Sequence, residues 1–176
     1  LGIARGLREE HRFESGRKIT FAPRVLLGAA ENPNVSPVEH RAVRLAKKIA
    51  AGAQFVQTQY CYDIPLLRRF MTAVEDAGLL EQVYILIGVG PLRTAKTGEW
   101  MRKNVPGIHI PDSVIERMKG AQDQTREGLN LCVDLIQEVR TIKGVSGVHV
   151  MAYRQEEAVA EVIERSGILA GRTPWF

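Results

Sequence analysis

The stretch RLAKKIAAGAQFVQTQYCYD, residues 44–63, decides the fold class of this sequence. Its first part continues a helical pattern, with apolar residues every three to four positions and Arg44, Lys47 and Lys48 on the opposite or flanking face. The run FVQTQ that follows is typical of a buried strand, and Asp63 is placed to cap the next helix. The stretch therefore predicts a helix, a strand and a second helix in immediate succession.

The first of these helices is predicted to start at Ser36. Ser36 is a good N-cap, Pro37 suits the first turn, and Glu39 is the third position of a capping box. The expected packed side of the helix consists of Val38, Ala42, Leu45, Ile49 and Ala53.

Three further runs rich in Val, Ile and Leu are bounded by turn residues and indicate strands. They are RVLLGAA from Arg24, VYILIGV from Val83 and GVHVMAY from Gly147. The first three strand starts are roughly 29 residues apart, which is the length of one βαβ step. A longer gap precedes the last strand and holds helical patterns after Thr94 and over 111–120 and 122–140, so we expect extra helices there.

The alternation of strands and helices predicts an α/β fold with parallel strands. A doubly wound dinucleotide domain should carry a Gly-rich turn after its first strand, and GAAENP does not contain G-x-G-x-x-G. We therefore expect a segment of a TIM-type (β/α)8 barrel, with ligands at the carboxyl ends of the strands.

Composition narrows the class of protein. The 176 residues carry a formal charge of +4 that is spread over mixed-sign helices, which disfavours nucleic acid as a partner. Two cysteines without metal-ligand spacing favour a reducing compartment, and no apolar run reaches the roughly 18 residues of a membrane span. The polar, helical start lacks the apolar core of a signal peptide, so we expect a cytoplasmic protein without a metal centre.

Polar residues near the predicted strand ends are the candidates for a site. Gln57 and Gln59 alternate on one face of a buried strand, and an amide buried without a partner costs roughly 1 to 3 kcal/mol. They either bond neighbouring groups or contact a ligand. Asn32 can form a turn or face a cofactor, and Lys47 and Lys48 can be a solvated helix face or hold a phosphate.

Histidines and bulky side chains near the strand ends favour structural roles. His109 and His149 are interpreted as satisfied structural residues, because a lone histidine in such a place seldom acts as a base. Trp100 and Met101 are expected to pack rather than to stack on a flat ligand.

Several separated blocks together resemble the methylenetetrahydrofolate reductases in content, order and spacing from about residue 27 to 167. They are GAAENP, the 44–63 stretch, ILIGVGPLRTAK with EWMRKNVPGIHIP, and GVHVMAYRQEEAV. The resemblance implies a (β/α)8 barrel that holds FAD and reduces methylenetetrahydrofolate to methyltetrahydrofolate with NADH or NADPH. It also implies that residues 1–176 are the C-terminal half of one flavin-binding barrel domain, with strands five to eight.

The resemblance assigns roles to nine positions. Gln59 matches the glutamine that contacts the folate pterin and the nicotinamide in turn. The positions implied to contact FAD are Asn32, Arg44, Lys47 and Lys48. The positions implied to contact folate, besides Gln59, are Thr97, Met101, Arg154 and Gln155.

The family's general-acid glutamate and its Arg-Gly-Asp flavin contacts lie on strands outside this sequence. A half barrel would expose two sheet edges, so we expect the chain alone to be unstable and inactive, or to pair with another half barrel in a homo-oligomer. An electron-transfer or accessory subunit is a further expected partner. The alternatives left open are a non-redox folate-binding or regulatory paralogue and a pterin-dependent methyltransferase barrel.

Overall fold

Four parallel strands form one sheet in the order β1-β2-β3-β4 in a computed structural model that describes residues 1–37 and 39–172. The strands are β1 (Gly28–Glu31), β2 (Phe55–Tyr60), β3 (Tyr84–Val89) and β4 (Val145–Val150). The helices are α1 (Gly2–Glu9), α2 (Glu39–Ala50), α3 (Ile64–Asp76), α4 (Ala95–Asn104), α5 (Asp112–Gly120), α6 (Gln124–Val139) and α7 (Ala158–Ser166). A short 3-10 turn, Leu80–Gln82, precedes β3.

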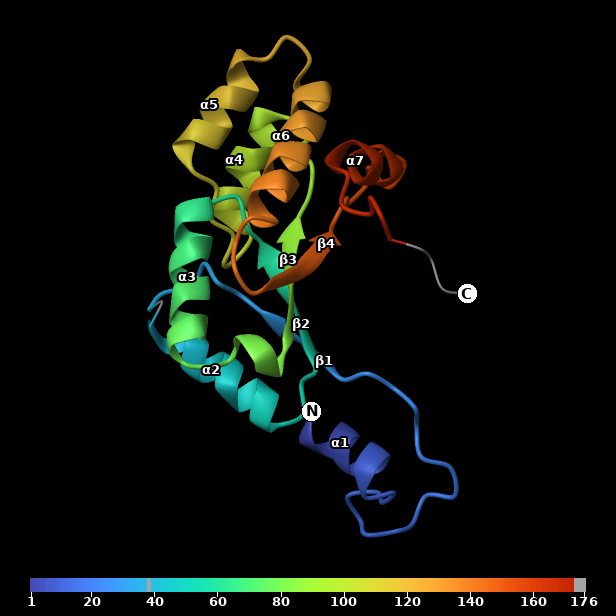
Figure 1. The fold of residues 1–176 in the computed structure, drawn as a ribbon. Coiled ribbons are helices and arrows are strands. Elements are labelled where there is room, and N and C mark those ends of the chain that lie inside the picture. The colour runs from blue at the N-terminus through green and yellow to red at the C-terminus, as the bar shows by residue number, and fades with distance from the viewer. Residues whose placement is uncertain (38, 173–176) are drawn as a thin grey trace.

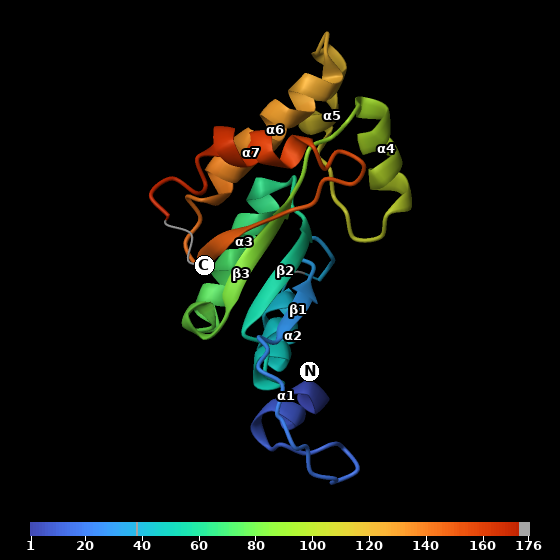
Figure 2. The ribbon, with the colours of Figure 1, turned by 90° about the vertical axis from the view of Figure 1, so that its right-hand side faces the viewer.

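Two helices cover one face of the sheet. Figure 1 shows α2 and α3 together on that side, where Leu45, Val56 and Phe70 are fully buried in the shared core. Figure 2 looks onto the opposite face, on which the strands lie open. The alternation of side chains along a strand places Gln57 and Gln59 on this open face and Val56 on the covered one, as the sequence predicts.

Local signals place the ends of the helices as expected. Asp63 caps α3 by accepting a hydrogen bond from the Leu66 amide at 2.8 Å, and Gly78 follows the helix with a positive φ of 66°. Thr94 caps α4 through the Thr97 amide at 3.1 Å. The helix predicted to start after Ser36 begins at Glu39, so Pro37 is not in its first turn, and Val38 lies outside the described residues.

The extra helices predicted before the last strand are confirmed. α4, α5 and α6 all lie between β3 and β4, and Figure 1 shows them clustered beyond the carboxyl end of β3. The buried face of α6 includes Leu131, Cys132 and Ile136, which join the core of the sheet layer.

Several predicted boundaries are wrong, including that of β4, which begins at Val145 rather than Gly147 and ends at Val150. The first strand begins at Gly28 rather than Arg24, because pairing with β2 starts at the register Gly28↔Phe55. Without a partner strand, Leu26 stays 72% exposed. The start of the chain is expected to be helical over residues 1–17, but its helix ends at Glu9 and the chain turns at Gly16.

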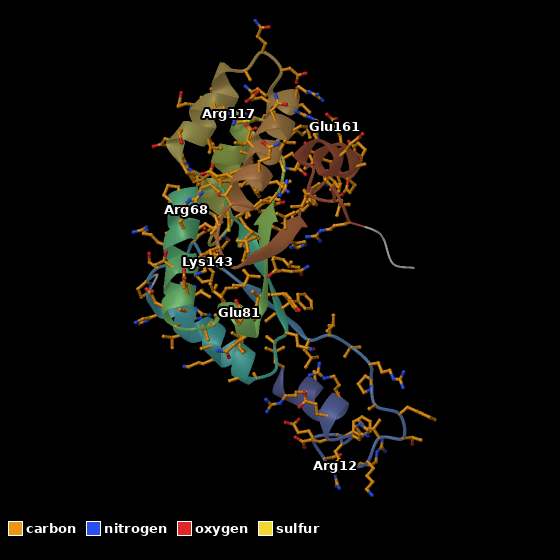
Figure 3. The ribbon with its side chains drawn as sticks, in the orientation of Figure 1. Arg12, Arg68, Glu81, Arg117, Lys143 and Glu161 are labelled. Carbon is orange, nitrogen blue, oxygen red and sulfur yellow. The ribbon has the colours of Figure 1, made fainter. Side chains whose placement is uncertain are left out.

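Charged side chains at the α5–α7 end of the molecule pair with one another. Arg117 on α5 contacts Glu127 at 2.5 Å and Asp134 at 2.8 Å, both on α6. Glu161 on α7 accepts from Arg165 at 3.1 Å and also pairs with Arg126 of α6. Figure 3 shows Arg117 and Glu161 at this end, away from α1. These cations are therefore compensated locally.

Candidate functional site

A cavity of about 430 Å³ is lined by residues of the open sheet face, of the end of β1 and of α2. The open face of the sheet contributes Ala30, Gln57, Gln59, His149 and Met151 to its lining. Three cations of α2 form another wall: Arg41, Arg44 and Lys48. Because these three are spaced i, i+3 and i+7, they share one face of the helix, whereas Lys47 points elsewhere.

A β-bulge shapes the strand that carries Gln59. The register between β2 and β3 shifts between Gln57 and Tyr60, and the Thr58 hydroxyl accepts a hydrogen bond from the Gly88 amide at 2.8 Å across the irregularity. Gln59 Oε1 accepts from the Tyr60 amide at 3.0 Å. The bulge thus orients the side chain, and the Gln59 amide NH₂ is the group available to a ligand.

Gly88 lies where β3 approaches β2 closely, beside the irregularity that carries Gln59. It pairs in register with His149 on β4. A Cβ at Gly88 would lie 2.4 Å from the Thr58 carbonyl oxygen and 2.7 Å from both the Gln59 carbonyl oxygen and Met151 Cε. A residue with a side chain would therefore collide with the strand backbone, so glycine is needed where β3 passes Gln59.

A buried ion pair lies at the end of β1. The Glu31 side chain is 2% exposed, and its carboxylate lies 2.7 Å from Lys48 Nζ, which also donates to the Ala30 carbonyl at 2.6 Å. The other carboxylate oxygen of Glu31 accepts from the Asn32 amide at 2.9 Å. Glu31 is thus fully satisfied, and much of the Lys48 charge is neutralised.

Asn32 organises the loop after β1 as well as lining the cavity. Its side chain donates to the Gly107 carbonyl at 3.0 Å and accepts from the Asn34 amide at 3.0 Å. The turn interpretation of Asn32 is therefore confirmed, while its place in the lining keeps a ligand contact open.

Arg41 and His149 carry nitrogen atoms without partners. Arg41 is 3% exposed, and its Nε is buried with no hydrogen-bond partner. His149 Nδ1 is in the same state. Both residues contribute to the lining of the cavity, and these two nitrogen atoms are themselves buried.

The family model for methylenetetrahydrofolate reductase matches residues 18–167. The chain belongs to the methylenetetrahydrofolate reductase family. Methylenetetrahydrofolate reductase 2 of Saccharomyces cerevisiae is 27% identical over 163 residues, which covers 86% of this chain and 26% of the relative. The enzyme of the same name from Schizosaccharomyces pombe is 26% identical over 136 residues, covering 73% of this chain and 21% of the relative. The chain thus spans about a quarter of these relatives' length.

A solved structure shares the fold. An uncharacterized protein from Clostridium thermocellum, which binds two copies of 5-methyl-5,6,7,8-tetrahydrofolic acid, superposes with a TM-score of 0.62 at 17% sequence identity. The match covers 93% of this chain and 67% of that chain. At this identity the likeness supports the α/β fold with its parallel sheet.

The structure gathers four of the nine positions that the family resemblance assigns. Gln59, Asn32, Arg44 and Lys48 line the cavity together. Lys47 is exposed on α2 and is outside that lining.

The four assigned positions near the later strands lie elsewhere. Thr97 is engaged with Thr94, hydroxyl to hydroxyl at 3.0 Å, and Met101 packs on the core. Arg154 lies over the Tyr153 ring, and Gln155 donates to the Pro91 carbonyl at 3.3 Å.

The sequence analysis assigns no site role to four residues of the cavity: Glu31, Arg41, His149 and Met151. The spacing of Arg41 from Arg44 and Lys48 is a signal that could have found it. Likewise, His149 and Met151 follow Gly147 at the two-residue period of one strand face.

No helix of residues 1–37 and 39–172 combines the length and apolar character of a membrane span. Within the same residues, no cluster of three or more His, Cys, Asp or Glu side chains is arranged to hold a metal ion.

Proposed function

We propose that this chain forms part of a flavin-dependent methylenetetrahydrofolate reductase. The reaction is reduction of 5,10-methylenetetrahydrofolate to 5-methyltetrahydrofolate with NADH or NADPH as donor. In this proposal β1–β4 are the last four strands of a (β/α)8 barrel, and residues 1–176 are its C-terminal half. Membership of the family and a parallel sheet with an open inner face support this arrangement.

The observation that carries the proposal is the cavity at the strand ends. It combines an amide, Gln59, with a cationic wall on α2, which suits a flat polar ring joined to an anionic group. The cations Arg41, Arg44 and Lys48 in its lining suit the phosphate groups of a flavin nucleotide. When bound, FAD supplies the hydride chemistry.

The residues of this chain bind and orient. Gln59 presents its side-chain NH₂ to acceptor atoms of the folate ring, while its side-chain oxygen Oε1 accepts a hydrogen bond from the Tyr60 backbone amide. Arg44 adds positive charge at the mouth of the cavity, while Asn32 holds the loop that borders it. The proton needed at the one-carbon unit is not assigned to a residue of this chain.

The test is an anaerobic redox cycle. The protein that contains the whole proposed barrel is supplied with FAD, and its absorption is followed at about 450 nm during addition of NADH or NADPH and then methylenetetrahydrofolate. The proposal expects a flavin band that bleaches with a donor and returns with the folate. A protein that binds methyltetrahydrofolate but never retains flavin would contradict it.

A second candidate is folate binding without redox chemistry. The observation that favours it is the Clostridium thermocellum neighbour, which binds 5-methyl-5,6,7,8-tetrahydrofolic acid. Saturable methyltetrahydrofolate binding without flavin in the same experiment would support this candidate.

A further inference from the structure

The side chain of Asn34 joins three segments that lie far apart in the sequence. Asn34 lies in the loop after β1, and its side-chain NH₂ donates to the Tyr60 carbonyl at the end of β2 at 2.8 Å. The same NH₂ donates at 3.2 Å to the carbonyl of Gly107, which lies between α4 and α5. The Asn34 backbone amide donates to the side-chain oxygen of Asn32 at 3.0 Å. One short residue thus connects the loop after β1, the end of β2 and the loop after α4.

Donation to two carbonyl oxygens sets the orientation of the Asn34 side-chain amide. Its oxygen, Oδ1, is buried and has no hydrogen-bond partner among the described residues. A flipped amide would place that oxygen against both carbonyl oxygens and would lose both hydrogen bonds. Leaving a buried acceptor unpaired is costly, so the two donated bonds must outweigh that cost.

Tyr60 links Asn34 to the cavity residue Gln59. The Tyr60 backbone amide donates to Gln59 Oε1 at 3.0 Å, while the Tyr60 carbonyl accepts from Asn34. The Tyr60 hydroxyl also donates at 3.0 Å to the carbonyl of Met151, another residue of the cavity lining. Because the register of β2 is irregular between Gln57 and Tyr60, regular strand pairing alone does not fix this backbone. The position of the Gln59 side chain therefore depends on the hydrogen bond from Asn34.

Gly107 has to be glycine to accept these hydrogen bonds. Its φ is +76°, and an added Cβ would lie 2.1 Å from Asn32 Nδ2. Its carbonyl accepts from the Asn32 side chain at 3.0 Å as well as from Asn34. Two residues further on, His109 forms an isolated β-bridge with Cys61, which directly follows β2. The loop after α4 is therefore fixed against the end of the strand that carries the cavity glutamine.

We propose that Asn34 is a positioning residue that orients Gln59 toward the substrate through Tyr60. Through Gly107 it also holds the loop after α4 beside the end of β2. Asn34 is outside the lining of the cavity, so it acts without touching the ligand. The inference rests on the proposed function for the identity of the substrate as a reduced folate, and the family resemblance gives Asn34 no role.

Hydrogen exchange of the Tyr60 backbone amide tests the positioning without any ligand. All variants are made in the protein that contains the whole proposed barrel. In Asn34→Ala the Tyr60 amide should exchange at least about fivefold faster, because the Gln59 side chain is no longer held against it. Asn104→Ala is the matched control, since the Asn104 side chain also donates to a backbone carbonyl, that of Trp100 at 2.8 Å, but on the exposed end of α4. This control should leave the Tyr60 exchange unchanged.

A double-mutant cycle separates positioning from a general loss of structure. Methyltetrahydrofolate is titrated by calorimetry into the parent, Asn34→Ala, Gln59→Ala and the double variant. Asn34→Ala should weaken binding about fivefold in the parent but less than about twofold in the Gln59→Ala background, because no Gln59 amide is left to orient. If Asn34→Ala does not fold, Asn34→Asp takes its place, since a carboxylate has the same shape and cannot donate.

The two measurements distinguish failure of the positioning from failure of the proposed function. If the Tyr60 amide exchanges faster in Asn34→Ala but the parent does not bind methyltetrahydrofolate, the positioning of Gln59 stands and the folate assignment fails. Four results overturn the positioning role: unchanged Tyr60 exchange in Asn34→Ala, equally fast exchange in Asn104→Ala, affinity losses that add in the double variant, or failure of both Asn34 variants to fold.

Discussion

Lys48 lies 2.7 Å from the carboxylate of Glu31, and the two side chains join α2 to the end of β1. The Glu31 side chain is 2% exposed and that of Lys48 is 26% exposed. The pair therefore fixes the edge strand against the helix that carries the cationic wall. Because the Glu31 carboxylate has so little contact with water, its negative charge is stabilised in the folded protein mainly by Lys48.

Removing one partner of this pair should destabilise the protein more than removing both. Lys48→Met leaves the Glu31 carboxylate buried without a cation, and we expect a loss of about 2 kcal/mol in the free energy of unfolding, measured in urea. The double variant Glu31→Gln with Lys48→Met should recover most of that loss. Lys47→Met, on the exposed side, should change the value by less than about 0.5 kcal/mol. Equal losses in the Lys48 and Lys47 variants would contradict this account.

Gly88→Ala should damage the sheet where β2 and β3 approach closely. The added methyl group would lie 2.4 Å from the Thr58 carbonyl oxygen, which belongs to a neighbouring strand and cannot move alone. We expect a loss of about 3 kcal/mol in the free energy of unfolding. Gly120→Ala is a suitable control, since nothing lies within 4 Å of its added Cβ. The prediction fails if the two variants unfold at the same urea concentration.

The protein should lose stability as the pH rises above about 9. Burial raises the pKa of the Cys61 and Cys132 thiols from 9.0 to about 12. Above pH 9 the unfolded chain therefore releases these protons while the folded protein keeps them, which favours unfolding. For each thiol, the free energy of unfolding should fall by up to about 1.4 kcal/mol per pH unit between pH 9 and 12. This fall levels off as the pH approaches 12.

Urea unfolding at pH 8, 9 and 10 measures this slope. The double variant Cys61→Ala with Cys132→Ala should be less stable at pH 8, because it loses buried volume, but its stability should fall less steeply with pH. An unchanged slope would assign the alkaline loss to other groups, such as Tyr60 and Tyr62, whose pKa values burial also raises.

Much of the fold could be predicted because its signals are local. Asp63 and Thr94 cap helices through amides three residues away, and the strand runs carry their own apolar pattern. Gln59 could be placed at a site because parallel strands end at the same edge of a sheet. The start of β1 could not be predicted, since it depends on where Phe55 supplies a partner.

The positions of the charged side chains in the cavity were harder to predict than that of the Gln59 amide. Lys47 and Lys48 are adjacent in the sequence. Only the orientation of α2 on the sheet determines that Lys47 is exposed and that Lys48 pairs with Glu31. The burial of Arg41 likewise depends on packing around the helix and not on its own sequence neighbours. Side-chain burial depends on how the sheet and the helices pack together, so the residue pattern of one helix does not predict it.

Gln59 should control affinity for the folate while contributing little to stability. Gln59→Ala removes the amide NH₂ that faces the cavity, and we expect methyltetrahydrofolate to bind about tenfold more weakly, measured by calorimetry. Thr97→Val is the informative comparison. Its hydroxyl is engaged by Thr94 outside the cavity, so it should change the folate affinity less than twofold while lowering stability slightly. The reverse ranking, with Thr97→Val weakening folate more than Gln59→Ala, would move the folate from the Gln59 cavity to the start of α4.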